Sequence, residues 1–186
     1  MNSTRVLAPV SAVILGLSVF AFGRLASPPQ AILDEETISG TITATRMITQ
    51  NARLTGDVTC IVESAPCIQF GAPGLTLNLS GFAITGRANP STGCQGDRVG
   101  NAAGTFNEEG IGAFDQADET IQGPGLVQRF RGDGIMLFNS TRSLVAHVTA
   151  STNCQSGILI FNSSDNHIES NVSVRNGASV FPCGGI

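Results

Sequence analysis

The sequence predicts an all-β solenoid, in which short parallel strands stack from one coil to the next around a single core. Three observations lead to this fold class. Residues 134–153 and 157–176 are two copies of one phrase, with Gly, aliphatic residues, Phe and Asn recurring at an offset of 23, and such a period is typical of solenoids. Leu alternates with polar residues at 75–80, as in a strand with one buried face. The 22 Gly and 13% charged residues indicate a turn-rich β protein, because long surface helices need Glu, Lys and Ala.

The repeat also predicts which side chains lie over one another. Equivalent residues of successive coils would be roughly 4.8 Å apart in parallel ladders. In the second copy we expect one extra residue, after which the offset rises from 23 to 24. The resulting alignments include Leu144 with Ile168, Val148 with Val172, and Ala150 with Val174. The expected rows are an aliphatic one (Ile111, Ile135, Ile158), an aromatic one (Phe114, Phe138, Phe161), and an amide ladder of Asn139 over Asn162.

Length and charge restrict the class of protein. The chain has 186 residues and a formal net charge of -4, which suits one domain with a real core. Lys and Arg together number only 10, and Trp and Tyr are absent. We therefore expect no nucleic-acid partner, since that function needs a broad basic surface.

The N-terminus is predicted to be an export signal. Arg5 precedes an uncharged, mostly apolar run at 6–22, and Ala21-Phe22-Gly23 is a small-x-small cleavage pattern. We expect a short apolar helix in a signal peptide over residues 1–23, and a mature protein that is secreted, periplasmic or on the cell surface. The alternative is a membrane anchor, for which the run is short. Membrane contact is then expected only through an uncleaved signal.

A linker and a long loop frame the predicted domain. The linker covers residues 24–36 and contains two prolines that forbid helix. The solenoid follows over residues 37–186. Turns are expected at Gly56-Asp57 and at 123–125 (Gly-Pro-Gly). A Gly-, Asn- and Pro-rich loop at 87–109 is too long for an ordinary turn, and is either a binding loop or a solvated insertion.

The chain resembles a known family at the level of its repeat phrases. L-T-L-N-L-S-G-F-A-I-T-G at 75–86, and the Gly-Ile-x-Leu and Asn-x-x-Val/Ile phrases at 134–177, resemble right-handed parallel β-helix repeat proteins of the pectate-lyase-like superfamily. The resemblance covers roughly residues 37–186 and includes no catalytic signature. It implies a right-handed parallel β-helix of about five coils. A β-sandwich, the main rival fold, would not explain why whole phrases recur.

Five cysteines suit an oxidising compartment. Cys60 and Cys67 bracket a short loop and are candidates for a disulfide, as are Cys154 and Cys183, which precede equivalent coil starts. Free thiols are the alternative for both pairs, since sequence does not fix connectivity. Cys94 has no evident partner.

The amide ladder has a competing explanation. Asn139 and Asn162 each begin an Asn-x-Ser/Thr glycosylation sequon. Because the sequons recur with the repeat, a structural ladder explains them more economically than glycans do.

Catalytic chemistry has only weak candidates. Hydrolysis of a polysaccharide needs two suitably spaced carboxylates, and the candidates are Asp115, Asp118 and Asp133, for which solvated turns are the alternative. The sequence motifs of polygalacturonases and pectate lyases are missing. Two histidines in non-equivalent places make a poor metal site, so no metal and no cofactor are expected.

The predicted function follows from these points. We expect an exported scaffold or carbohydrate-binding protein without catalytic activity, with a polysaccharide as its partner. The alternative is a carbohydrate-active enzyme, a lyase or glycoside hydrolase, working beside the 87–109 loop. Residues 183–186 resemble the start of another coil. The domain is therefore expected to be C-terminally incomplete, continued by further coils or covered by a capping partner.

Overall fold

The computed structural model describes residues 35–88 and 108–177. The predicted signal segment, most of the linker, most of the long loop and Cys183 lie outside these residues. Thirteen strands form the described part, and within it no helix is long and apolar enough to cross a membrane. The strands are β1 (Glu36–Ile42), β2 (Arg46–Ile48), β3 (Ala52–Cys60), β4 (Ile68–Phe70), β5 (Thr76–Asn78), β6 (Ala83–Thr85), β7 (Ile111–Phe114), β8 (Thr120–Gln128), β9 (Ile135–Phe138), β10 (Leu144–Ser151), β11 (Ile158–Phe161), β12 (His167–Glu169) and β13 (Val172–Val174).

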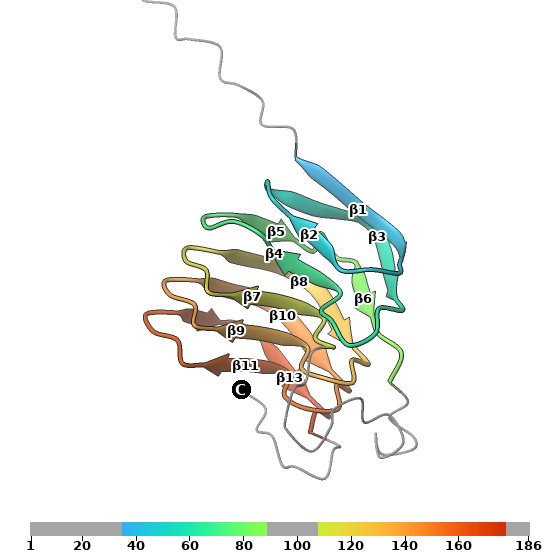
Figure 1. Ribbon diagram of the computed structural model, residues 1–186. Helices are drawn as coiled ribbons and strands as arrows, with labels where there is room; N and C mark the ends of the chain where they lie inside the picture. The colour runs from blue at the N-terminus through green and yellow to red at the C-terminus, as the bar shows by residue number, and fades with distance from the viewer. Residues whose placement is uncertain (1–34, 89–107, 178–186) are drawn as a thin grey trace, which may run out of the picture. The chain divides into compact units, whose positions relative to one another are not determined.

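Successive coils contribute strands to two parallel sheets (Figure 1). The five-stranded sheet has the order β11-β9-β7-β4-β2. The eight-stranded sheet follows β1-β3-β5-β8-β10-β12, with β6 between β3 and β8 and with β13 beside β10. Every one of these pairings is parallel. This is the parallel solenoid that the repeat predicts.

The core is built from rows of aliphatic side chains, one from each coil. Ile68, Ile111, Ile135 and Ile158 are paired in register along the five-stranded sheet, and all four are fully buried. The eight-stranded sheet adds a second row of Leu77, Ile121 and Val145. Burying each such side chain stabilises the fold by about 1.5–3 kcal/mol.

The long strands bend at a coil corner instead of ending there. β8 pairs with β5 before residue 123 and with β6 after residue 125. The turns predicted at Gly56-Asp57 and at 123–125 are therefore wrong, since these residues lie within β3 and β8. The corner needs a glycine because a side chain at Gly123 would collide with the backbone of His147 on the next coil. The local turn signal marks a bend in a strand that stays paired.

The offset of 24 predicted for the end of the second copy is also wrong. Ala150 lies opposite Ser173, so the offset remains 23. Val172 and Val174 lie opposite Thr149 and Ser151 of the preceding coil, and their side chains are exposed. Side-chain amides hold this register, because Asn171 bonds to the backbone 23 residues earlier. The alignments that fail are Leu144 with Ile168, Val148 with Val172, and Ala150 with Val174.

Four asparagines bond to the backbone of the preceding coil in the same way. In each, the side-chain oxygen accepts from the N–H 23 residues earlier, and the side-chain nitrogen donates to the carbonyl 26 residues earlier. They satisfy backbone groups where the chain turns between strands, which would otherwise be costly to bury. The four are Asn153, Asn166, Asn171 and Asn176.

The structure confirms one of the two predicted disulfides and leaves the other untested. Cys60 and Cys67 form a disulfide, with 5.9 Å between their Cα atoms, which confirms that predicted pair. Cys154 is buried and disulfide-bonded. The pairing of Cys154 with Cys183 stays a prediction, because Cys183 lies outside the described residues.

Removing one buried amide should destabilise the solenoid. Asn153 is fully buried, so N153A leaves the N–H of Phe130 and the carbonyl of Val127 without their partner. We expect a loss of about 2–4 kcal/mol in urea unfolding. The exposed Asn162 provides the control, and N162G, which suits its left-handed backbone, should cost under about 1 kcal/mol. Equal losses in the two variants would show that Asn153 does not stabilise the solenoid through its hydrogen bonds to the preceding coil.

Candidate functional site

The three predicted carboxylates do not meet in one place. Asp115 and Asp118 follow the end of β7, in an exposed turn. Asp133 precedes β9 and is almost completely buried. Since β7 and β9 are parallel and in register, residues after one and before the other lie at opposite ends of the sheet. The structure therefore separates two kinds of site, one exposed and one buried.

The exposed site includes a ladder of side chains at the end of the five-stranded sheet. Asn162 Nδ2 donates to Asn139 Oδ1, and Asn139 Nδ2 donates to Asp115 Oδ1 at 2.8 Å. All three residues have φ between 49° and 54°. Asn and Asp tolerate this left-handed conformation better than most residues do. We call these three residues the turn ladder.

An ion pair flanks the turn ladder. The Arg142 guanidinium donates to both oxygens of Asp118, at 2.8 and 2.7 Å. These hydrogen bonds and the guanidinium charge lower the pKa of the Asp118 carboxyl. Both side chains are more than half exposed, so solvent screens the pair and its effect on stability is small.

Phenylalanines on the outer face of the five-stranded sheet lie directly beside the turn ladder. The rings of Phe138 and Phe161 stack with centroids 5.7 Å apart, and those of Phe114 and Phe138 lie 6.5 Å apart at a tilt. Phe161 is 57% exposed. We call these three residues the phenylalanine row.

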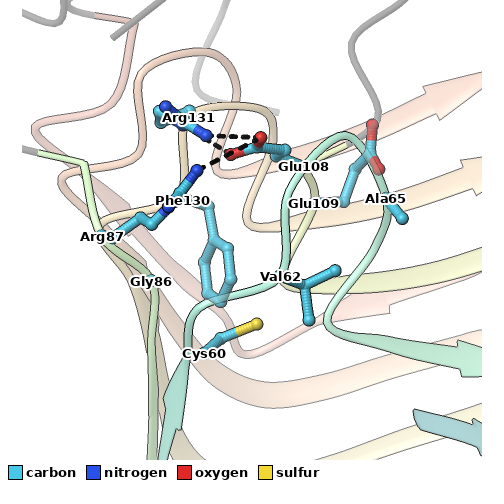
Figure 2. Close-up of a pocket in the computed structure, with 9 residues that line it drawn as sticks. All are labelled: Cys60, Val62, Ala65, Gly86, Arg87, Glu108, Glu109, Phe130 and Arg131. Atoms are coloured by element: carbon cyan, nitrogen blue, oxygen red, sulfur yellow. Dashed lines mark hydrogen bonds and ion pairs between the residues drawn. The ribbon is translucent and has the colours of Figure 1, made fainter. Parts of the chain in front are cut away.

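The buried site lies where the described chain resumes at residue 108. Glu108 receives two hydrogen bonds of 2.5 Å from Arg131, and Arg87 is 4.0 Å from it. Figure 2 shows the Glu108 carboxylate between the two guanidinium groups. Arg87 also pairs with the exposed Glu63 at 2.6 Å. The charge of Glu108 is therefore compensated on two sides.

Glu109 is the uncompensated member of this cluster. It is fully buried, its carboxyl oxygens have no hydrogen-bond partner, and it points away from the two arginines (Figure 2). Desolvation raises the pKa of Glu109 to about 8, with smaller contributions from Asp133 and Glu108. Desolvation likewise raises the pKa of Asp133 to about 6, although Asp133 accepts a 2.7 Å hydrogen bond from the Ser156 N–H.

The buried cluster has little free space. The cavity beside it measures about 10 Å³, room for roughly one water molecule. A sugar cannot enter such a cavity. Its lining comprises Cys60, Val62, Ala65, Gly86, Arg87, Glu108, Glu109, Phe130 and Arg131.

One signal in the sequence could have indicated this cluster. Glu109 precedes Gly110-Ile111 as Asp133 precedes Gly134-Ile135, at an offset of 24. Two acidic residues at one repeat position, just before a buried strand, predict neighbouring carboxyl groups. Burial itself could not be predicted, because it depends on coils distant in the sequence.

The described residues contain no group of three or more His, Cys, Asp or Glu side chains placed to hold a metal ion. The expectation of no metal and no cofactor stays a prediction.

Comparison with known proteins agrees with this geometry. Residues 96–185 match the family model described as "Right handed beta helix region". No curated protein and no solved structure matched the chain. Residues 96–185 thus resemble the right-handed β-helix family, and the parallel pairing of the described strands agrees with the β-helix repeat architecture that the repeat phrases predict.

Stability should depend on pH through Glu109. An unfolded glutamate ionises near 4.5, whereas Glu109 holds its proton to about 8 when folded. The unfolded state therefore loses the proton first, and stability should fall as pH rises through this interval. The full shift corresponds to roughly 3–5 kcal/mol. Asp133 adds a smaller fall below about pH 6.

Urea unfolding at pH 4, 6 and 8 measures this effect. The neutral variant E109Q should resemble the wild type at pH 4, exceed its stability at pH 8, and lose most of the slope. D133N should flatten the curve only below about pH 6. Parallel curves for the wild type and E109Q would show that Glu109 does not hold a proton in the folded state.

Proposed function

We propose that this protein is an exported, non-catalytic β-helix that binds polysaccharide on the outer face of its five-stranded sheet. One observation carries the proposal: each of three successive coils ends its strand with a partly buried or exposed Phe, followed at once by Asp or Asn. The pairs are Phe114-Asp115, Phe138-Asn139 and Phe161-Asn162. A site that repeats in this way suits a ligand that itself repeats.

The chemistry of the two rows suits a sugar chain. A pyranose ring has an apolar C–H surface and an edge of hydroxyl groups. The phenylalanine row offers apolar area, and the turn ladder offers amide and carboxylate groups, a combination typical of ligand sites. The Nδ2 of Asn139 and of Asn162 each uses one hydrogen in the turn ladder. A second N–H on each remains for a hydroxyl group.

The carboxyl groups favour binding over catalysis. A glycosidase needs a general acid that holds a proton and reaches the leaving oxygen. Among the described residues, Asp118 is exposed but has a lowered pKa, while Glu109 has a raised pKa but is buried beside a cavity too small for a sugar. Neither residue meets both conditions.

Export fits the covalent structure. The disulfide between Cys60 and Cys67 would persist in an oxidising compartment. Together with the apolar N-terminal segment, it supports a secreted, periplasmic or cell-surface location.

A glycan-array screen of the full chain, combined with assays for reducing sugar and unsaturated uronate, tests the proposal. We expect binding without turnover. F161A should then weaken binding of the selected glycan about tenfold, which corresponds to about 1.4 kcal/mol. Val172, 53% exposed on β13 in the other sheet, is the matched control, and V172A should bind like the wild type. Turnover, or equal binding by F161A and V172A, would contradict the proposal.

A further inference from the structure

At the N-terminal end of the solenoid, the residues that the structure describes leave two strand edges without a neighbouring strand. β1 is the last strand of the eight-stranded sheet and β2 the last of the five-stranded sheet, so among the described residues neither has a neighbour beyond it (Figure 1). Natural sheets protect such edges with Lys, Pro or inward-pointing charges. Residues 37–51 contain none of these, and their only charged residue is Arg46, which pairs with Glu36.

Backbone groups on these edges point outward in a regular pattern. The Glu36 N–H bonds to Asn51 and the Ile42 carbonyl bonds to Ile61, so the even-numbered residues of β1 face β3. In a parallel ladder the alternate residues face the other way. Thr37 and Thr41 therefore direct their N–H and C=O groups to the open edge, and Ser39 occupies the alternate position between them, at the register shift of the ladder.

β2 follows the same rule. The Arg46 N–H bonds to the Cys67 carbonyl, and the Ile48 carbonyl accepts from Gly71. Both residues thus face β4, which leaves the backbone of Met47 facing outward. Its side chain is 48% exposed.

The sequence of β1 is nearly symmetric about Gly40. Ile38-Ser39-Gly40-Thr41-Ile42 reads almost the same in both directions, with Ile38 and Ile42 facing the core. Gly40 has φ of 80° and open space where a side chain would be, so two backbones can approach closely there. A second copy could pair antiparallel with β1 so that the two Gly40 residues lie opposite each other. Ser39 of one copy would then lie opposite Thr41 of the other, and Ile38 opposite Ile42. The core-facing side chains of both copies would lie on the same side of the shared sheet.

We propose that two copies of this chain join head to head, with β1 of each pairing antiparallel with its counterpart across a twofold axis that passes between the two Gly40 residues. The outward-facing residues then form the hydrogen-bonded pairs, with Ser39 of each copy opposite Thr41 of the other. The joint extends the core from one solenoid into the other as an isologous interface.

Light scattering after gel filtration of the full chain tests the joint. The wild type should have twice the mass of one chain. The double variant S39K/T41K would set two lysines opposite each other at two places across the joint, and like charges directly opposite destabilise a strand pair. It should run at the mass of one chain, and its unfolding midpoint should not rise with protein concentration, as that of a dimer does.

Two further variants make the test specific. S39E/T41K would set opposite charges across the same pairs and should restore the dimer. T55K/T59K adds the same charge to exposed positions of β3, one strand inward, and should remain dimeric. A monomeric wild type, a dimer that survives S39K/T41K, or a failure of S39E/T41K to restore it would each overturn the proposal.

Discussion

The structure depends on the parallel register between successive coils. Each residue lies over its equivalent one coil away. Side chains of one kind that recur in the sequence therefore form a row along the stack. Aliphatic side chains repeated inward make the core row of Ile111, Ile135 and Ile158. Asparagines repeated at the corners satisfy the backbone where no strand pairs. A change at one coil therefore affects mainly the coils next to it.

The same register produces two repeated features, one exposed on the outer face and one buried inside. On the outer face it aligns the phenylalanine row with the turn ladder, and so repeats a small amphipathic site once per coil. Inside, it brings Glu109 and Asp133 together as neighbouring acidic side chains. Desolvation raises the pKa of both carboxyl groups, and the charge of Asp133 adds a smaller contribution at Glu109, so the fold tolerates Glu109 by keeping its proton. We infer that the exposed repetition serves binding, while the buried repetition makes stability sensitive to pH.

Much of the fold could be predicted from the repeat, because buried rows leave a clear trace in the sequence. The row of Ile111, Ile135 and Ile158 and the disulfide of Cys60 with Cys67 are observed as expected. Local turn signals were misleading at 123–125, since a strand paired on both sides can bend without ending.

The site was harder to predict than the fold. Matching apolar residues between the two copies predicts an offset of 24 for Val172 and Val174. The hydrogen bond from the Val148 N–H to the Asn171 side chain instead holds the offset at 23. The buried state of Glu109 depends on residues from several coils, which no local pattern records. What the sequence does record is the repeated Phe-Asp/Asn step, because that feature lies within single coils.

Hydrogen exchange along the chain, with and without a bound oligosaccharide selected from the array, tests the proposed binding face directly. We predict slowed exchange at the strand ends and turns that carry the phenylalanine row and the turn ladder, at residues 114–118, 138–142 and 161–165, without breakdown of the sugar. Protection centred instead on residues 108–109 and 131, accompanied by cleavage of the sugar, would contradict it and would place the function at the buried carboxyl cluster.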